Sequence, residues 1–237
     1  MGYLCVYYIH AGEDGFGYPA FGAAKAISYE WMWPLLVRNI IGTWLIAGGW
    51  DWFLHFSPLA DSMKPFKINA TPPLISQLKH DAFWTTIASV WGTVIEVLVC
   101  IMYANSGDFY PKLLIERPYL HTVLALLITH WRVPHFYAMH RFLHPWRLKN
   151  FPDIGRFMYK HIHSLHHKSY NPTTLSGTSF HPVESMMYYS ACFLVAPFSV
   201  HITIPVGCII DCGIGAWLGH DGFMAPGVGH QFHQHHH

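Results

Sequence analysis

Two long apolar segments constrain the fold more than any other feature of the sequence. Residues 35–56 and 82–104 each reach the roughly 20 residues that a helix needs to cross the hydrocarbon core of a bilayer. In the whole chain 52% of the residues are hydrophobic and only 11% are charged, which argues against a water-soluble globule. We therefore predict an all-α fold, a multi-pass membrane helical bundle.

Two further apolar regions belong to this bundle. Residues 119–139 are apolar up to Ile128 and more polar beyond it, so this helix is expected to leave the hydrocarbon before its end. The last apolar region, 186–218, is interrupted by Pro197 and Pro205. These prolines predict a helical hairpin that enters the membrane and returns, rather than two straight spans.

Charged side chains inside apolar segments need water or a partner. Arg38, Asp51 and His55 lie near the two ends of the first segment, where they are expected to reach the membrane interface. Glu96 lies within the second segment and is expected to face other helices as a packed, paired side chain.

The basic residues predict the orientation in the membrane. Half of the 14 lysines and arginines lie between Arg132 and Lys168, and none follows Lys168. Short loops rich in these residues stay in the cytosol, so this block is predicted to be cytosolic. Three crossings then place the N-terminus and residues 106–117 outside, and the connection 57–79 inside. In a eukaryote we expect the membrane of the endoplasmic reticulum, with the histidine clusters on its cytosolic side.

Charge and cysteine content exclude two other classes of site. A net charge of +1 offers no basic field for a nucleic acid, so no nucleic-acid partner is expected. The five cysteines include no Cys-x-x-Cys pair, and most lie in apolar stretches. They predict reduced, buried thiols rather than a disulfide framework or a thiolate metal site.

Histidine is the outlier of the composition, with 20 residues, most of them in the stretches 130–181 and 220–237. Imidazoles three or four residues apart share one face of a helix and can bind one ion or two adjacent ions. Eight histidines at this spacing are more than one ion needs as ligands, so two metal ions are predicted. Imidazole alone does not distinguish zinc, iron, copper and nickel. The zinc-protease pattern His-Glu-x-x-His is absent. The groups at this spacing are His140 and His144; His163, His166 and His167; and His233, His236 and His237.

The order of these groups and their neighbours is characteristic. The chain contains His140-Arg-Phe-Leu-His144, Tyr159-Lys-His-Ile-His-Ser-Leu-His-His167, Phe180-His-Pro-Val-Glu184, His220-Asp-Gly and His233-x-x-His-His237 around apolar segments. This ordered set resembles the fatty acid hydroxylase and sterol desaturase superfamily, and leans toward its C-5 sterol desaturase-like membrane di-iron proteins. The resemblance covers roughly residues 79–237. We take 1–34 as an N-terminal segment and 35–237 as the membrane-embedded domain.

The resemblance implies a non-haem di-iron oxidoreductase of lipid metabolism or sterol biosynthesis, with a cytosolic histidine-rich di-metal cap on the bundle. Two iron ions, for which zinc can substitute, would use O₂ as co-substrate to attack an unactivated C–H bond of a sterol or fatty acyl lipid. Cytochrome b5 or a similar donor would supply electrons. Which lipid and which carbon react, and whether the outcome is hydroxylation or desaturation, stay open. The metal ligands implied by the resemblance are His140, His144, His163, His166, His167, His181, His220, His233, His236 and His237.

Other residues near these motifs are given smaller roles, and no catalytic residue beyond the metal centre is identified. Glu184 and Asp221 are interpreted as helix-end charges or as hydrogen-bond acceptors for the ligands. His161, His230 and His235 lie inside the clusters but off the family spacing.

One departure from the family pattern concerns the C-terminus. Family members continue past the last histidine motif, whereas this chain stops at His237, so the domain is expected to be truncated at its C-terminus. The alternative for the terminal histidines is a purification tag. The competing functions are a membrane metal transporter, a haem-binding protein and an inactive truncated relative. Clusters in polar stretches flanking the spans argue against the first two.

Overall fold

The computed structural model describes residues 23–106, 116–147, 152–195, 198, 200–224 and 236. Over these ranges the chain forms helices joined by loops and no β-strand, which confirms the all-α prediction. His230, His233, His235 and His237 lie outside the described residues, as does most of the N-terminal segment 1–34. The proposed domain boundaries therefore stay a prediction.

The first helical run covers the apolar segment 35–56. It consists of α2 (Tyr29–Thr43), the π-helical turn η3 (Trp44–Gly48) and α3 (Gly49–Phe56), which follow one another without a break. Ser28 caps its start, because its hydroxyl accepts a hydrogen bond from the N–H of Glu30 at 3.3 Å. The short helices α4 (Ala60–Met63) and η4 (Lys64–Phe66) then lead toward α5.

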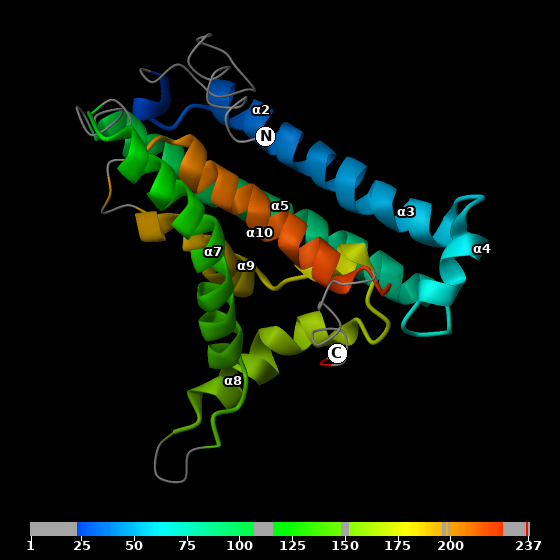
Figure 1. The fold of residues 1–237 in the computed structure, drawn as a ribbon. Coiled ribbons are helices and arrows are strands. Elements are labelled where there is room, and N and C mark those ends of the chain that lie inside the picture. The colour runs from blue at the N-terminus through cyan, green and yellow to red at the C-terminus, as the bar shows by residue number, and fades with distance from the viewer. Residues whose placement is uncertain are drawn as a thin grey trace.

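Helix α5 (Ile75–Asn105) is 31 residues long, about 46 Å at the usual helical rise. Among the described residues it is the one helix whose length and hydropathy suffice to cross a membrane. It packs against α2, α9 and α10 (Thr203–His220), and Figure 1 shows α5 beside α10, with α2 and α3 along one side. A multi-pass arrangement therefore stays a prediction.

Helices α7 (Pro118–Leu143) and α8 (Ile154–His161) extend the molecule away from this core. The start of α7 lies beside α10, and its end diverges from the bundle toward α8 (Figure 1). α7 continues through Pro134, and α8 begins after Asp153, whose carboxylate accepts a hydrogen bond from the N–H of Arg156 at 2.9 Å.

The chain between α8 and α10 forms short elements: η6 (His163–Lys168), η7 (Thr174–Thr178), α9 (Pro182–Tyr189) and η8 (Ser190–Val195). Glu184 in α9 contacts His163, and His220 at the end of α10 lies beside His166. The region 186–218 thus leaves the histidines and comes back to them, while its predicted entry into a membrane stays a prediction.

The segment after α10 pairs with the connection after η4. The N–H of Ile68 donates to the carbonyl of Gly222 at 2.9 Å, and the N–H of Met224 donates to the carbonyl of Phe66 at 2.7 Å. Gly222 has φ of 85°, a conformation that glycine adopts without strain. The connection 57–79 and the end of α10 therefore lie at the same end of the molecule as the histidines.

The core lies between α2, α5, α9 and α10. Glu96 faces it as expected: the Nη2 atom of Arg38 lies 2.5 and 2.6 Å from its two carboxylate oxygens. A buried carboxylate needs such a partner, because transfer of an unpaired charge out of water costs several kcal/mol.

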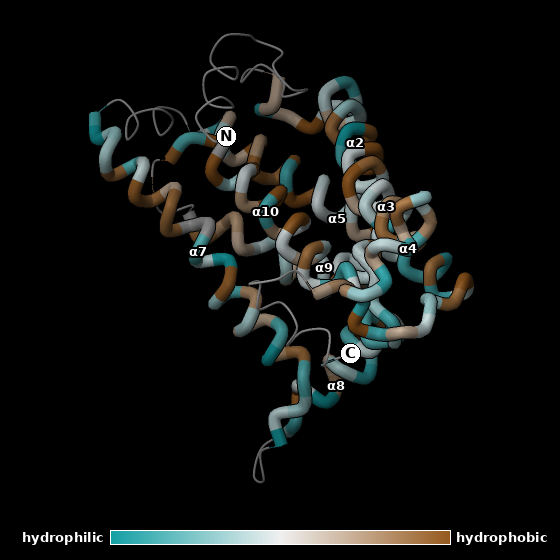
Figure 2. Tube along the Cα trace, turned by 45° about the vertical axis from the view of Figure 1, so that its right-hand side comes forward, coloured by the Kyte–Doolittle hydropathy of each residue, from teal (hydrophilic) through white to brown (hydrophobic). Residues whose placement is uncertain are grey.

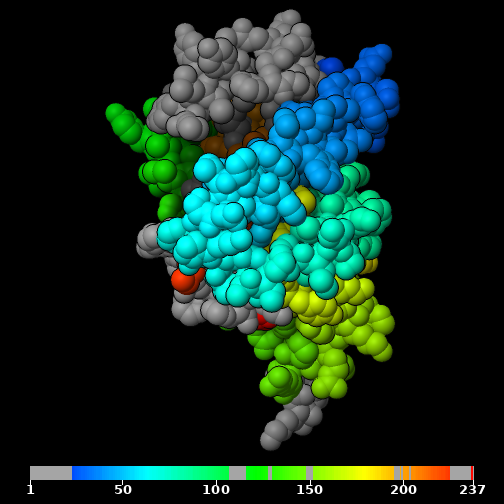
Figure 3. All heavy atoms as spheres, turned by 90° about the vertical axis from the view of Figure 1, so that its right-hand side faces the viewer, coloured from blue at the N-terminus to red at the C-terminus, as the bar shows by residue number. Residues whose placement is uncertain are grey.

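Apolar side chains also cover much of the outer surface. Figure 2 shows brown, hydrophobic stretches along α2, α3 and α5, whereas teal, hydrophilic residues gather around α8. In Figure 3 the α2–α4 segment covers one side of the molecule and the α8 region lies at one end. The exposed apolar residues on α2, η3, α3 and α7 include Ile41, Trp44, Leu45, Trp52, Phe56, Val123, Leu126, Leu127, Trp131 and Val133.

Candidate metal centre

Imidazoles from three parts of the chain meet at the end of α7. His140 and His144 lie on its last turn and just after it, His163 and His167 lie on η6, and His236 comes from the C-terminal end. The ligating nitrogens of His140, His144, His163 and His236 all lie within 4.8 Å of one another. We call His140, His144, His163, His167 and His236 together the histidine cluster.

The spacing of the ring nitrogens fits a single ion. Nε2 of His144 lies 3.2 Å from that of His140, 3.1 Å from that of His163 and 2.9 Å from that of His236. Nε2 of His167 lies 3.1 Å from that of His163. Metal–nitrogen bonds of about 2.0–2.1 Å separate neighbouring ligands by about 2.9 Å in an octahedron and about 3.3 Å in a tetrahedron. The cluster could therefore hold a metal ion with little movement.

Burial keeps these imidazoles in the form that binds metals. It lowers the pKa of His144 to about 4 and that of His163 to about 3. The pKa of His167 is lowered to about 3, first by burial and then by the neighbouring histidines. A metal ligand must be the neutral imidazole, so the cluster is ready to bind a cation near neutral pH.

Glu184 orients His163. Its Oε1 atom lies 2.7 Å from Nδ1 of His163, and both residues are buried. A carboxylate at this position accepts the Nδ1 proton and leaves the lone pair of Nε2 directed at the cluster. Burial raises the pKa of Glu184, and a cation on the other ring nitrogen would favour the ionised carboxylate again.

His166 and His220 form a second, adjacent pair. Both are buried, and their ring centroids lie 5.1 Å apart, while His166 lies 5.5 Å from His163. Nδ1 of His220 lies 2.7 Å from the carbonyl of Ala216, which makes Nδ1 the donor and Nε2 the ring atom with the lone pair that a metal would need. The η6 turn thus presents His163 and His167 to one group and His166 to the other.

The remaining predicted site residues are placed differently. Nδ1 of His181 accepts a hydrogen bond from the N–H of Val183 at 3.2 Å and caps α9. Asp221 accepts from the N–H of Phe223 at 3.0 Å. His161 is exposed and stacks on Phe157 at 4.6 Å. His233 and His237 fall outside the described residues, so the full ligand set stays a prediction.

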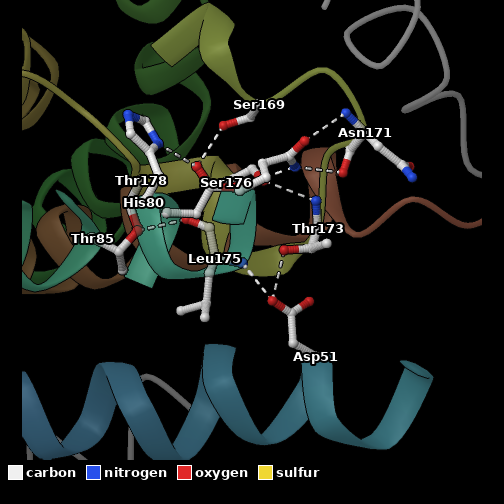
Figure 4. Close-up of polar contacts among 11 residues, drawn as sticks. Asp51, His80, Thr85, Ser169, Asn171, Thr173, Leu175, Ser176 and Thr178 are labelled. Atoms are coloured by element: carbon white, nitrogen blue, oxygen red, sulfur yellow. Dashed lines mark hydrogen bonds and ion pairs between the residues drawn. The ribbon is translucent and has the colours of Figure 1, made fainter. Parts of the chain in front are cut away.

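A buried carboxylate that the sequence analysis placed at the membrane interface supports this site. Asp51 is only 4% exposed. Its two oxygens accept from the hydroxyl of Thr173 at 2.8 Å and from the N–H groups of Thr174 and Leu175 at 2.6 and 3.1 Å (Figure 4). The expectation was wrong because the first N–H groups of η7 need an acceptor, and α3 supplies it.

Asp81 of α5 holds the same loop from a second helix. It accepts hydrogen bonds from the hydroxyls of Ser169 at 2.6 Å and Ser176 at 2.8 Å (Figure 4). Gln77 adds a hydrogen bond from its amide to the carbonyl of Asn171 at 2.8 Å. We call Asp51 and Asp81 with loop 169–178 the carboxylate clamp. Because η6 ends directly before this loop, the clamp fixes the turn that carries His163, His166 and His167.

The clamp leaves a weak signal in the sequence. Thr173 and Ser176 have the spacing of a capping box, and both of its reciprocal hydrogen bonds are present. Their carboxylate partners lie about 90 to 120 residues earlier in the chain, a separation that no local pattern reveals.

A close backbone approach joins the end of α7 to α8, the helix that leads into η6. A Cβ atom on Gly155 of α8 would collide with the carbonyl oxygen of His144 and the indole of Trp146. Asp153 also accepts from the N–H of Trp146 at 2.9 Å and from that of Arg147 at 3.1 Å. Glycine at 155 therefore lets α8 sit against the end of α7, which brings His163 to His144.

The comparisons with known proteins point to a lipid enzyme. The chain is 21% identical over 193 residues to the rice protein very-long-chain aldehyde decarbonylase GL1-9, in both the indica and the japonica subspecies. The alignment covers 77% of this chain and 69% of the rice protein. No protein-family model and no solved structure matches. This distant similarity gives loose support to the superfamily resemblance.

Proposed function

We propose that this protein is a membrane-bound, metal-dependent oxidoreductase that modifies an unactivated C–H position of a lipid. The observation that carries the proposal is the convergence of the ring nitrogens of His140, His144, His163 and His236, which all lie within 4.8 Å of one another. Imidazole-only sites of this kind suit redox metals as well as zinc. The distant similarity to a lipid-modifying enzyme favours lipid as the substrate.

We propose two iron ions as the active metals, with zinc as a substitute. The histidine cluster would hold one, and His166 and His220 would contribute to the other. His181, His233 and His237 complete the proposed set through the family resemblance. When bound, redox-active iron would supply the means to activate O₂ toward a C–H bond.

The aromatic residues beside the histidines would keep water away from the reacting position. Phe136 stacks near His140 with ring centroids 5.3 Å apart, and Phe180 lies 4.9 Å from His166. Tyr188 contacts both phenylalanines, at 5.6 and 5.2 Å. These rings stand between the histidines and the bundle, so a lipid approaching from the bundle would meet an apolar, water-poor surface.

We propose a multi-pass membrane protein with the histidine end in the cytosol. The exposed apolar faces of α2, α3 and α7 support contact with lipid. The basic residues gather at the histidine end, which agrees with a cytosolic position.

The same basic residues suit an acidic electron carrier such as cytochrome b5. Arg141, Arg156, Lys160 and Lys168 are exposed around α8 and η6. A positive surface near the metals would steer such a donor to the site.

The rice relative favours a second candidate reaction. Its name describes an enzyme that removes the carbonyl group of a very-long-chain aldehyde. A long-chain aldehyde is therefore proposed as an alternative to a sterol or fatty acyl substrate, on the same metal centre.

The test is metal content together with the lipid profile of a host that expresses the full chain. We expect about two metal ions per wild-type chain and a changed lipid profile. His144→Ala and His236→Ala should remove at least one ion and abolish the lipid change, because both residues belong to the cluster. His161→Ala, which alters an exposed histidine outside the cluster, is the matched control.

Three results would overturn the proposal. The first is retention of metal and lipid change in both cluster variants. The second is a haem absorption band in the wild type. The third is metal transport into vesicles without any change of lipids.

A further inference from the structure

A cavity separate from the histidines lies between α2, α5 and α10. Its volume is about 230 Å³, and its lining contains none of the proposed metal ligands. Most of the lining residues are aliphatic, aromatic or glycine. Each of the three helices contributes one glycine to the lining: Gly42, Gly92 and Gly213. A Cβ atom on Gly42 would meet nothing within 4 Å, so this glycine leaves open space.

The cavity extends along α10. Its lining on α10 runs from Val206 to Trp217, which is about 16 Å along the helix. His220 lies one turn beyond Trp217, so the Trp217 end is the one nearer to the histidines. Figure 1 shows α2 and α10 running in the same direction and α5 in the opposite one. Arg38 and Glu96 therefore mark the far end of the cavity.

Its mouth opens to the apolar outer surface. Ile46 of η3 and Ile210 and Ile214 of α10 line the cavity and are 54%, 57% and 38% exposed. An opening bordered by exposed isoleucines admits a molecule from a lipid phase and disfavours a hydrated solute.

The volume favours an unbranched chain over a sterol. Drug-sized ligands occupy pockets of about 300–1,000 Å³, and the fused rings of a sterol belong to that size class. The 230 Å³ here is smaller and is spread along the helices, which suits part of one alkyl chain.

The far end of the cavity is polar, but its side chains carry no net charge. Arg38 is paired with Glu96, and the amide of Asn39 donates to Glu96 at 2.7 Å and to Thr93 at 3.0 Å. An anionic head group would have to compete with Glu96 for Arg38. A neutral oxygen, as in an alcohol, meets the dipoles of this end without displacing the ion pair.

We propose that this cavity binds one long, unbranched lipid chain, with a neutral oxygen group next to Arg38 and Asn39 and the chain extending toward Trp217. The assignment of this lipid as the substrate rests on the function proposed above, and it selects a linear long-chain lipid over a sterol. Binding itself does not depend on the metal.

The test compares two substitutions in the same helical run. Gly42→Leu places a side chain in the cavity, whereas Gly49→Leu places one at a position that also has nothing within 4 Å but does not line the cavity. The purified full chain is equilibrated with a linear long-chain alcohol, with or without cholesterol, and binding is measured by native mass spectrometry. We expect the alcohol to bind the wild type and Gly49→Leu equally, and Gly42→Leu at least about tenfold more weakly.

Metal content measured on the same samples separates the two proposals. Gly42→Leu should retain the metals of the wild type, because the cavity shares no residue with the histidine cluster. Equal binding to Gly42→Leu and wild type, or displacement of the alcohol by cholesterol, would refute the cavity assignment and leave the metal proposal intact. If the purified wild type bound the alcohol but had never contained metal, the enzyme proposal would be refuted. The cavity assignment would stay intact.

Discussion

The histidine cluster and the carboxylate clamp both bury polar side chains at the same end of the molecule, but they compensate for lost water differently. In the clamp, Asp51 and Asp81 accept hydrogen bonds from hydroxyl and N–H groups of loop 169–178. In the cluster, ring nitrogens of the same type face one another at 2.9–3.2 Å. Two neutral imidazoles that face each other through the same ring nitrogen share a single proton, and one bound cation would accept lone pairs from several such nitrogens at once.

This difference suggests a structural role for the carboxylate clamp and a ligand-binding role for the histidine cluster. A clamp whose acceptors match its donors is complete without a ligand and stabilises the fold. A cluster of ring nitrogens of one kind is the arrangement that a bound cation would stabilise, which is why we place the proposed function there. The clamp holds the loop that follows η6, so a region that needs no ligand supports the region where we propose that a metal binds.

Metal removal should produce the largest difference between the two regions. A metal present at about 1,000 times its Kd stabilises the folded state by about 4 kcal/mol, and a strong chelator removes this contribution. Amide hydrogen exchange should therefore accelerate in α8 and η6, while exchange in loop 169–178 changes little. Equal acceleration in both regions would show that the clamp does not stand independently of the site.

Replacement of Asp51 should produce the next largest effect, now on the clamp. Asp51→Ala leaves the hydroxyl of Thr173 and the N–H groups of Thr174 and Leu175 buried without this acceptor. An unsatisfied buried donor costs about 1–3 kcal/mol, so we expect a loss of about 3 kcal/mol in unfolding free energy, measured by denaturant titration in micelles. Asp61→Ala removes an exposed carboxylate and should cost much less. Equal stability of the two variants would argue against the clamp.

Glu184 connects the two regions, because it is a buried carboxylate that serves a cluster histidine. Glu184→Gln keeps an acceptor for Nδ1 of His163 but removes the charge that strengthens the ligand. Loss of such a partner typically weakens metal binding by about 10 to 100-fold, which titration against a competing chelator measures. Glu30→Gln, at an exposed helix start, is the control. Unchanged affinity in Glu184→Gln would leave the carboxylate with a packing role alone.

The sequence predicted the cluster better than the clamp, for a physical reason. His140 with His144, and His163 with His167, are four residues apart, and one helical or 3₁₀ turn brings each pair together without help from the rest of the fold. The partners of Asp51 are set by how α3 packs on η7, and an aspartate near the end of an apolar segment looks the same whether it meets water or a buried loop.

The same reasoning explains two partial successes. The pairing of Glu96 was predictable because a charge inside an apolar helix requires a partner, but its partner Arg38 was not, since the spacing of helices decides it. His181 shares a motif with Glu184, yet its Nδ1 caps α9, because the start of that helix offers an N–H group that needs an acceptor.

Asp153 should give the smallest effect, because it is a half-buried carboxylate in the connection between α7 and α8, away from the histidine cluster. Hydrogen bonds from the N–H groups of Trp146 first, and then Arg156 and Arg147, hold its pKa below the ordinary 3.8. A lowered pKa in the folded state means that the stabilisation is present above pH 3.8 and is lost as the pH falls through the folded-state value. Asp153→Asn should therefore speed amide exchange at the start of α8 modestly at neutral pH, since water competes for the same N–H groups.

The pH dependence distinguishes this cap from the clamp and the cluster. At low pH wild-type Asp153 becomes neutral, so the exchange rates of wild type and Asp153→Asn, each divided by its intrinsic rate, should converge. A constant difference from neutral to acid pH would assign the effect to amide geometry rather than to charge. An effect on metal affinity as large as that of Glu184→Gln would contradict this distinction, because a half-buried cap would then control His144 as strongly as a buried carboxylate controls His163.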